Sequence, residues 1–329
     1  MAGRICVFIF ALLFLFSSCS QEGAQIPEEL TVATFNVQSL FDDVDDGDEY
    51  SPYRKHEGWN TEKYSARLDR IADLIRSCLE CDIIFFQEVE SAKVLADLLD
   101  SPLARRGYRY YAVAESSSPV SVGFISRHEP VDVSVHSVPG QRLVLRAEFI
   151  IRARQLIIYC IHAKSNLGDS DENRSLRLEC SMLLNSLYSR DFPAPVIILG
   201  DFNSQPVLDC SDLMTLVGKH DSQTIAAQGS LPVVMDAGSA DSLSFYDPLL
   251  SADNAAGADG TYFHEGVFYD YDRILAGATV CRTYECSVEI VDSISPGGLC
   301  PAEYDPQTGE GLSDHFPVKL TLSAPAHDN

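Results

Sequence analysis

The amino-acid sequence predicts an α+β fold in which two packed β-sheets are flanked by helices within a single domain. Short apolar runs typical of strands dominate the chain, and several are continuous enough to be covered on both faces. Amphipathic helical segments interrupt these runs at intervals, as packed sheets with flanking helices require. No internal repeat or break in composition divides the 329 residues, and a hydrophobic content of 46% suffices for a large core.

Residues 1–18 have the pattern of a secretory signal peptide. Their apolar run, residues 5–16, is too short to span a bilayer, because a span needs about 20 apolar residues. Two serines directly before Cys19 resemble the cleavage site of a bacterial lipoprotein, although Phe16 stands where an aliphatic residue is usual. We therefore expect an exported cell-envelope lipoprotein with Cys19 as its lipidation site. The alternative is an ordinary signal that is cut nearby.

The first elements of the predicted fold are a strand and a helix separated by an acidic segment. The strand covers residues 30–36 and ends in a turn. The acidic stretch 42–49 is expected to be a solvated loop, because Val44 interrupts the oxygen spacing of a calcium loop. From Lys63 onward apolar residues recur at helical spacing, with Asn60 or Thr61 available as the N-cap.

The later elements are mostly short strands. A second amphipathic helix is predicted around residues 176–187, and residues 236–261 and 295–311 are expected to form long surface loops. The predicted strands are 83–86, 108–114, 120–126, 143–150, 155–162 and 196–199.

The charge of the chain limits the partners that it can bind. Its 24 basic and 48 acidic residues give a formal net charge of −24. Proteins that coat long stretches of nucleic acid neutralise phosphates with clustered Lys and Arg, so this function is not expected here. A metal site that draws one phosphate into a cleft is compatible, because the ion supplies the local positive charge.

The cysteines leave two interpretations open. Ten cysteines, less one in the signal and the one expected to be lipidated, leave eight, an even number that permits disulfides in an oxidising compartment. Cys78 and Cys81 are spaced as half of a zinc site, but no second pair follows to complete it. The remaining interpretations are isolated buried thiols, or one or two disulfides among Cys281, Cys286 and Cys300.

Polar residues stand at the ends of several apolar runs. Loops at strand ends are where a rigid scaffold presents catalytic groups. Carboxylate and amide oxygens gathered there would suit Mg²⁺, a hard ion that prefers octahedral oxygen ligands. The residues are Asn36 after TVATF, Gln87 and Glu88 after IIFF, His162 at the end of LIIYCI, Asp201 and Asn203 after VIILG, and Asp314 with His315 before FPVKLTL.

These motifs resemble a known family. The strings FNVQSLFD, FFQEVE, YCIHAKSN, ILGDFNSQP, YDRIL and LSDHFPV stand in the order shown by the endonuclease/exonuclease/phosphatase superfamily, in particular its bacterial exported nuclease-like branch. The resemblance implies a four-layer αββα sandwich, with two packed mixed β-sheets and the site at one rim. It covers residues 30–322 and implies that they form a catalytic domain. The polar stretch before it, residues 19–29, is expected to be a tether, and residues 323–329 a tail.

The resemblance implies a metal site built from oxygen ligands. Glu88 would be the principal ligand, with Asn36 and Asp314 in or near the coordination shell. The expected cofactor is Mg²⁺, with Mn²⁺ or Ca²⁺ as alternatives. The competing interpretations are that Asn36 only caps a turn and that Glu88 is a solvated strand end.

The resemblance also implies roles for five catalytic residues. Asp201 and Asn203 would orient or activate the attacking water and hold the scissile phosphate. His315 would contact the phosphate or act as base, with Asp272 as its orienting partner. His162 matches the histidine that protonates the leaving oxygen in some branches of the family.

Other residues carry weaker signals. Tyr159 and Lys164 are candidates for substrate binding, but a tyrosine three positions before His162 in a strand lies on the opposite face unless a bend intervenes. Arg142 and Arg174 are interpreted as structural. The histidines outside the motifs have no context that indicates a function.

Three functions remain compatible with the sequence. The first is hydrolysis of DNA or RNA phosphodiester bonds by metal- and histidine-assisted attack of water. The second is phosphoester hydrolysis of a phospholipid, as in sphingomyelinases, or of an inositol phosphate, although no obvious aromatic hairpin of the kind found in membrane-acting relatives is visible. The third is an inactive surface-binding protein, which the presence of every catalytic residue type argues against. The chain is expected to be a monomer held at the membrane by its lipid anchor.

Overall fold

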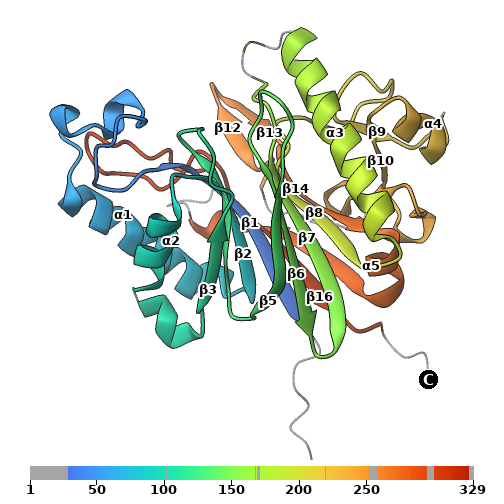
Figure 1. Cartoon of the computed structure of the whole chain (residues 1–329), viewed down its shortest axis with the longest axis horizontal. Coiled ribbons are helices and arrows are strands. Elements are labelled where there is room, and N and C mark those ends of the chain that lie inside the picture. Colours follow the sequence, from blue (N-terminus) through green and yellow to red (C-terminus); the bar gives the residue numbers. More distant parts are fainter. Residues whose placement is uncertain are drawn as a thin grey trace, which may run out of the picture.

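Two β-sheets stack face to face, and helices cover the outer face of each sheet (Figure 1). The computed structural model describes residues 29–100, 102–166, 168, 171–218, 220–251, 258–294 and 300–325. The four-layer αββα sandwich and the α+β class are therefore confirmed. The predicted signal peptide, Cys19 and most of the tether lie outside the described residues.

The two sheets have six and eight strands. In order across it, the smaller sheet consists of β15 (Glu285–Ile290), β16 (Val318–Ser323), β1 (Leu30–Leu40), β2 (Ile83–Val89), β4 (Ser121–Ser126) and β3 (Tyr110–Val113). The larger sheet consists of β5 (Pro130–His136), β6 (Val144–Ile151), β7 (Arg154–His162), β8 (Val196–Asp201), β14 (Asp272–Gly277), β11 (Phe245–Tyr246), β10 (Leu231–Val234) and β9 (Met214–Leu216).

Helices and a separate hairpin complete the fold. The hairpin pairs β12 (Tyr262–His264) with β13 (Val267–Tyr269). The α-helices are α1 (Thr61–Leu74), α2 (Ala92–Leu99), α3 (Asp171–Asp191), α4 (Ser222–Ala227) and α5 (Ala278–Thr283). Shorter helical turns are η1 (Ser51–Tyr53), η2 (Lys55–Glu57), the π-turn η3 (Ile75–Leu79), η4 (Pro102–Arg106), η5 (Ala237–Ser239), η6 (Pro248–Leu250) and η7 (Asp292–Ile294).

The alternation of side chains along each strand builds the layers. Successive residues of a strand point to opposite faces of the sheet. On β1, Val32 lies between the two sheets, whereas Phe35 packs under the helices of the smaller sheet. On β7, Ile158 lies between the sheets, whereas Ile157 packs with residues of α3. Three hydrophobic clusters therefore separate the four layers.

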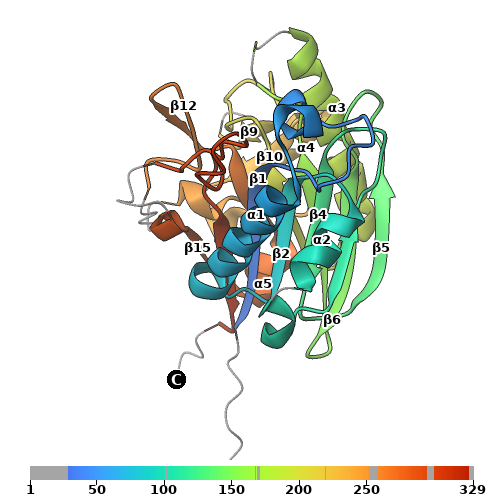
Figure 2. The ribbon, with the colours of Figure 1, turned by 90° about the vertical axis from the view of Figure 1, so that its left-hand side faces the viewer.

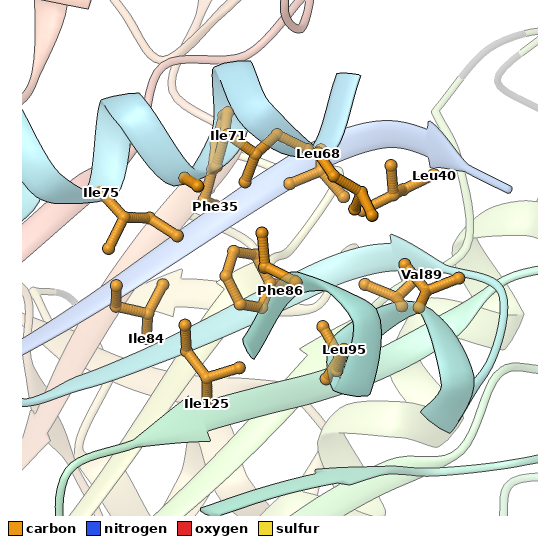
Figure 3. Packing of buried hydrophobic residues seen from close by; sticks show 14 of the residues in the cluster. Phe35, Leu40, Leu68, Ile71, Ile75, Ile84, Phe86, Val89, Leu95 and Ile125 are labelled. Atoms are coloured by element: carbon orange, nitrogen blue, oxygen red, sulfur yellow. The ribbon is translucent and has the colours of Figure 1, made fainter. Parts of the chain in front are cut away.

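Helix α1 shows how the outer layer is attached. Leu68 and Ile71 of α1 and Ile75 at the start of η3 recur at helical spacing, as the sequence predicts, and pack against Phe35 and Phe86 of the sheet (Figure 3). The predicted N-cap is also confirmed, because the side chain of Asn60 accepts hydrogen bonds from the first backbone N–H groups of the helix. This helix fixes the position of β1, whose C-terminal end carries site residues.

The predicted surface loop at residues 236–261 is partly wrong. Its Phe245 and Tyr246 form β11, a buried strand between β14 and β10 in the larger sheet. A strand of two residues is too short to show a period in the sequence. The acidic stretch at 42–49 is not fully solvated either, since Asp42 and Glu49 are buried and Glu49 accepts hydrogen bonds from backbone N–H groups.

The described cysteines favour isolated thiols. Cys281 and Cys286 are free, although both lie near each other beside the core between the sheets. Cys78 and Cys81 are also free thiols. None of the helices in the described part of the chain has the length and apolar character needed to cross a bilayer.

The two ends of the sandwich differ in character. β1 runs parallel to β2, and β7 runs parallel to β8, so the C-terminal ends of each pair meet at one rim. The hairpin β12–β13 lies at this rim, at the top of Figure 1. The turn between β6 and β7 lies at the opposite end, which both views show at the bottom (Figures 1 and 2). The rim collects the motif residues.

Candidate active site

Four predicted residues from four different strands meet at the rim. Asn36 donates a hydrogen bond from Nδ2 to Asp201 Oδ2 at 3.0 Å across 165 positions of sequence, and the same Nδ2 lies 3.5 Å from Glu88 Oε1. His162 Nε2 lies 3.4 Å from Asp201 Oδ2 and 3.8 Å from Glu88 Oε1. The ends of β1, β2, β7 and β8 therefore form one polar cluster.

Glu88 reaches the cluster because β2 is irregular at this point. Its φ of 65° is in the left-handed region, and the pairing register shifts immediately after Gln87. Gln87 is buried between the sheets, where it accepts a hydrogen bond from Thr34 and donates one to Cys160. Ser39 donates to Glu88 Oε2 at 2.9 Å. Gln87 therefore fixes the strand between the sheets, while Glu88 faces the site rather than bulk solvent.

The local structure explains why Gly200 and Asn203 flank Asp201 in the GDFN string. A Cβ at Gly200 would lie 2.0 Å from the backbone oxygen of Ile161, so only glycine fits between β8 and β7 there. Asn203 has a left-handed φ of 47°, and its N–H donates to Asp201 Oδ1 at 2.8 Å. Asn203 Nδ2 donates to the carbonyl of Ala163 at 3.3 Å. The turn thus holds Oδ1 of Asp201, whereas Asn36 contacts Oδ2.

His315 is paired with Asp272, as the family resemblance implies. His315 Nδ1 lies 2.6 Å from Asp272 Oδ2, and Asp272 stands opposite Asp201 in the β14–β8 register. Burial alone would lower the pKa of His315, but the carboxylates of Asp272, Asp314 and Asp201 outweigh it and raise the pKa to about 10. In this arrangement His315 carries a proton at neutral pH and is a hydrogen-bond donor.

Asp201 and His162 are both shifted toward their neutral forms. Burial, followed by the nearby charge of Asp272, raises the pKa of Asp201 to about 7 despite its contacts with His315, Asn203 and Asn36. Burial, followed by the positive charge of Arg142, lowers the pKa of His162 well below its usual value. The 3.4 Å distance between His162 Nε2 and Asp201 Oδ2 is therefore better described as a polar contact between neutral groups than as an ion pair.

The oxygen-rich part of the site fits a divalent cation. Asp314 lies close enough to Glu88 and Glu303 for their charges to raise its pKa, although burial contributes more. Like charges confined in a buried site are stabilised by a bound cation. Asn36 Oδ1 accepts a hydrogen bond from the N–H of Gln38, so Asn36 both caps a turn and belongs to the cluster. Glu88, Asn36 and Asp314 remain the predicted ligands.

A second compact group of possible ligand atoms has another explanation. Ligand atoms of Asp201, Asp272 and His315 lie within 4.8 Å of one another. Two of these side chains, however, are already joined by the 2.6 Å contact between His315 and Asp272. We therefore assign this group to the orientation of His315 and not to metal binding.

A cavity of about 470 Å³ opens onto the cluster and has an aromatic side. Tyr262, Tyr269 and Tyr271, here called the tyrosine wall, line it beside the catalytic residues. The rings of Tyr262 and Tyr271 stack with centroids 5.5 Å apart, and those of Tyr269 and Tyr271 with centroids 5.0 Å apart. The ring of Tyr262 also lies 4.5 Å from that of His315. Asn166 donates to the hydroxyl of Tyr271 at 3.0 Å.

The sequence does not predict the tyrosine wall or the aromatic hairpin beside it, whose aromatic side chains are only partly exposed. The hairpin β12–β13 also carries Phe263 and Phe268, whose ring centroids lie 4.8 Å apart. Its strands have only three residues each, which is too few for a periodic pattern. The available signal was the density of aromatic residues in TYFHEGVFYDY directly before the YDRIL motif.

Arg142 was predicted to be structural and His264 to have no function, but both line the cavity. The sequence indicates a structural role for Arg142, yet its Nε is buried without a hydrogen-bond partner among the described residues. A buried, unsatisfied guanidinium N–H beside a cavity is suited to an anionic ligand. Arg174, by contrast, forms a largely exposed ion pair with Asp171, in agreement with a structural role.

The two predicted substrate-binding residues do not line the cavity. Tyr159 is buried in the cluster beneath α3, and its hydroxyl donates to Asp191, so its predicted substrate role is wrong. The alternation of β7 places it on the opposite face from His162, as the core-packing alternative requires. The backbone carbonyl of Lys164 accepts a hydrogen bond from Arg177, and a phosphate contact by its side chain stays a prediction.

Comparisons with known proteins agree with this arrangement. Residues 31–227 match the model of the Endonuclease/Exonuclease/phosphatase family. No curated protein sequence matches the chain. The structure of Danio rerio TDP2 complexed with single strand DNA product is 14% identical with a TM-score of 0.57, and the match covers 90% of this chain and 99% of that chain.

Two other solved structures are similar. An endonuclease/exonuclease/phosphatase family protein from Bacteroides thetaiotaomicron is 17% identical with a TM-score of 0.56, over 90% of this chain and 98% of that chain. An AP endonuclease from Archaeoglobus fulgidus is 18% identical with a TM-score of 0.54, over 90% of this chain and 100% of that chain. At these identities the similarity shows a shared fold.

Proposed function

Because this chain belongs to the endonuclease/exonuclease/phosphatase family, whose members are phosphoester hydrolases, we propose that it is a divalent-metal-dependent phosphodiesterase acting on single-stranded nucleic acid. The observation that supports this most strongly is the convergence of Asn36, Glu88, Asp201 and His162 around one cavity, with the His315–Asp272 pair beside them. All of these residues stand at the positions that the family motifs imply.

The proposed metal site consists of Glu88, Asn36 and Asp314, with Mg²⁺ as the expected ion and Mn²⁺ or Ca²⁺ as alternatives. A bound cation would stabilise the negative charge that develops on the phosphate oxygens. Ser39 holds one oxygen of Glu88, which limits the rotation of this carboxylate. A fixed carboxylate provides a preorganised ligand.

Asp201 is the proposed acceptor of the proton from the attacking water. A carboxylate whose pKa is near 7 is suited to general base catalysis at neutral pH. Hydrogen bonds from Asn36 and from the N–H of Asn203 fix both of its oxygens. The new bond from water oxygen to phosphorus would form as the bond to the leaving oxygen breaks. Asp201 would take the proton of the water, and the leaving oxygen, which keeps the electron pair of the broken bond, would take a proton from solvent.

The two histidines have different proposed roles. Protonated His315, held by Asp272, would donate a hydrogen bond to the phosphate, which favours its contact role over its role as base. The lowered pKa of His162 does not support proton donation to the leaving oxygen at neutral pH. As a neutral ring, His162 would instead donate from Nε2 to Asp201 and hold it in place.

The tyrosine wall supports a nucleic-acid substrate. Stacking of a base on an aromatic side chain contributes roughly 1–3 kcal/mol and tolerates any sequence. Arg142 is the only Lys or Arg side chain among the described residues that line the cavity, so few phosphates would be neutralised there. This fits a single strand entering a cleft better than a duplex held along its length. TDP2, which has a similar fold, has a solved structure in complex with single strand DNA product.

One observation favours a second substrate class. Phe263, Phe268 and Val267, which is 49% exposed, lie on the hairpin at the rim of the cavity. Apolar side chains on a projecting hairpin can insert into a lipid surface. Phospholipid phosphodiester hydrolysis is therefore the alternative function, with inositol phosphate as a soluble substrate of the same type.

The proposal is tested by one substrate panel. Labelled single-stranded DNA, RNA, duplex DNA, phospholipid vesicles and inositol phosphate are each incubated with Mg²⁺ and with chelator. We expect cleavage of the single-stranded nucleic acids that chelator abolishes. Hydrolysis confined to the phospholipid or inositol phosphate would replace the proposal by its alternative, and hydrolysis of none of them would favour the inactive binding protein.

A further inference from the structure

The end of the sandwich opposite the cavity is rich in arginine. This basal end is defined by the starts of β1, β2, β3 and β7 and the ends of β4, β6 and β16, as the strand registers require. It contrasts with the formal net charge of −24 of the whole chain. The arginines at this end are Arg109; Arg127, which pairs with Asp82; Arg152 in the turn between β6 and β7; Arg154 at the start of β7; and Arg282 in α5.

The turn between β6 and β7 presents two of these arginines to solvent in a fixed geometry. Arg152 and Ala153 both have left-handed φ values, 52° and 61°, as in the tight turns that follow the twist of a hairpin. Arg152 and Arg154 are exposed and form no ion pair with any described carboxylate. Ile150, on the same hairpin, is 58% exposed. A tight hairpin with two cations that form no ion pair with a described carboxylate and with an exposed apolar residue is suited to an anionic lipid surface.

The polypeptide enters the fold at the same place. Leu30, the first residue of β1, lines a cavity of about 210 Å³ together with Arg152, Arg154 and Tyr284. The guanidinium of Arg154 lies 5.6 Å from the ring centroid of Tyr284. Residues 20–29 separate Cys19 from Leu30, and ten residues span at most about 35 Å. A lipid on Cys19 would therefore hold the basal end close to the membrane.

We propose that Arg152 and Arg154 bind the headgroups of anionic phospholipids in the membrane to which an acylated Cys19 attaches the chain. Charge complementarity and the entry point of the chain both select this partner. The contact fixes the orientation of the enzyme. Asn36 lies six residues along β1 from Leu30, about 20 Å at 3.3 Å per residue, so the cavity opens away from the lipid and toward the aqueous compartment.

The inference rests on acylation of Cys19 and is independent of the proposed nuclease activity. The full chain is produced in an exporting bacterial host, and the lipid on Cys19 is confirmed by mass. It is then reconstituted in phosphatidylcholine vesicles with or without phosphatidylglycerol, and hydrogen–deuterium exchange is followed in the hairpin at residues 150–155. The test variant is R152E/R154E. The matched control, K55E/R174E, makes the same charge change at Lys55 and Arg174, which follow the C-terminal ends of β1 and β7 in η2 and in the first turn of α3.

We expect hairpin exchange to be slower in phosphatidylglycerol vesicles, with protection that high salt removes. Two basic residues near an anionic surface shift binding by about 25-fold, at roughly fivefold each, so R152E/R154E should lose the protection while K55E/R174E keeps it. The inference would be overturned if the hairpin exchanged equally in both vesicle types. It would also be overturned if single-stranded DNA without vesicles protected the hairpin, or if Cys19 carried no lipid. Phosphodiesterase activity is measured on the same samples in detergent. R152E/R154E should be as active as wild type, and a wild type without activity refutes only the proposed function.

Discussion

Asp201 combines three properties at the scale of a single residue. It is buried, its two oxygens are held by Asn36 and by the backbone of Asn203, and its pKa is raised to about 7. A carboxylate in this state accepts a proton near neutral pH without the rotational freedom of a surface residue. A substitution at Asp201 can therefore test its proton acceptance apart from its packing.

The variant Asp201→Asn separates these contributions. The amide has the same shape but keeps only one of the two accepted hydrogen bonds, and it does not take a proton from water. We expect the rate of phosphodiester cleavage to fall by about 10²–10⁴-fold, the usual contribution of a general base, with a loss of about 1–3 kcal/mol in the free energy of unfolding for the lost hydrogen bond. Wild-type activity in a folded Asp201→Asn protein would show that the base is elsewhere.

The tyrosine wall permits a test of substrate choice. Tyr262→Leu removes the ring that lies beside His315, so a stacked base would lose roughly 1–3 kcal/mol of binding. We expect KM for a single-stranded oligonucleotide to rise by about 5–150-fold, while the rate on a small phosphodiester without a base stays within about twofold. Phe263→Leu, in which the ring packs on Phe268, serves as the control. Equal KM values for Tyr262→Leu and wild type would remove stacking from the proposal.

The site residues divide according to how the sequence encodes them. Glu88, Asp201 and His315 stand in short ordered motifs that resemble those of a known family, and this resemblance made them predictable. Local backbone geometry explains only parts of these motifs, such as Gly200, where a Cβ would meet Ile161. Arg142 comes from a loop without a motif, and its place in the cavity depends on how the two sheets stack. Such a contact is set by tertiary packing and leaves no local pattern.

At the scale of secondary-structure elements, α1 stabilises the C-terminal end of β1 through a buried arginine. Arg67 is 1% exposed and donates to the backbone carbonyls of Val37 at 2.6 Å and Ser39 at 2.9 Å. Its guanidinium lies 3.8 Å from the ring centroid of Tyr304. Ser39 has a left-handed φ of 57° and donates to Glu88. Arg67 therefore supports the turn that orients a proposed metal ligand.

Arg67→Met leaves these carbonyls buried without a donor. We expect a loss of at least about 2 kcal/mol in the free energy of unfolding, measured with denaturant, and weaker Mg²⁺ binding by calorimetry. Arg70→Met is the matched control, because Arg70 lies on the same helix but donates to the more exposed carbonyls of Gly309 and Gly311. Equal losses for the two variants would contradict a special role for Arg67.

Asp82 connects the starts of β1 and β2. Its carboxylate accepts hydrogen bonds from the backbone N–H of Thr31 at 2.9 Å and from its hydroxyl at 3.0 Å, and His128 lies 3.8 Å away. Burial raises the pKa of Asp82, but the contacts with His128 and Thr31 outweigh it, so the pKa lies below its usual value. A lowered folded-state pKa contributes stability above the unfolded value, and this stability is lost as pH falls through the folded-state pKa.

Asp82→Asn should therefore be less stable than wild type at neutral pH, by about 1–2 kcal/mol. The difference should shrink as the pH is lowered below about 4, where the wild-type carboxylate becomes protonated. Denaturant unfolding of both proteins between neutral and acidic pH measures it. A difference that stays constant over this range would mean that the charge of Asp82 contributes nothing.

For the whole molecule, two packed sheets with flanking helices were predictable because several strands are continuous apolar runs, which are covered on both faces. The four-layer order followed only from the family resemblance, because residues such as Ile157 and Ile158 are both apolar and do not show in the sequence which face meets which cluster. Short elements were not predictable: β11 has two residues and joins a sheet only because β10 and β14 leave a place for it. The separation of a catalytic rim from an arginine-rich basal end also arises only when the strands assemble.

The decisive measurement follows Mg²⁺ binding and oligonucleotide cleavage together in wild type and Glu88→Gln. We expect wild type to bind Mg²⁺ in a calorimetric titration and to cleave single-stranded DNA in a reaction that chelator abolishes. Glu88→Gln should remain folded but lose both properties, by about 10²-fold or more in cleavage rate, because Glu88 is the proposed principal ligand. Cleavage that persists in chelator, or wild-type binding and cleavage in Glu88→Gln, would contradict a metal-dependent phosphodiesterase centred on this cavity.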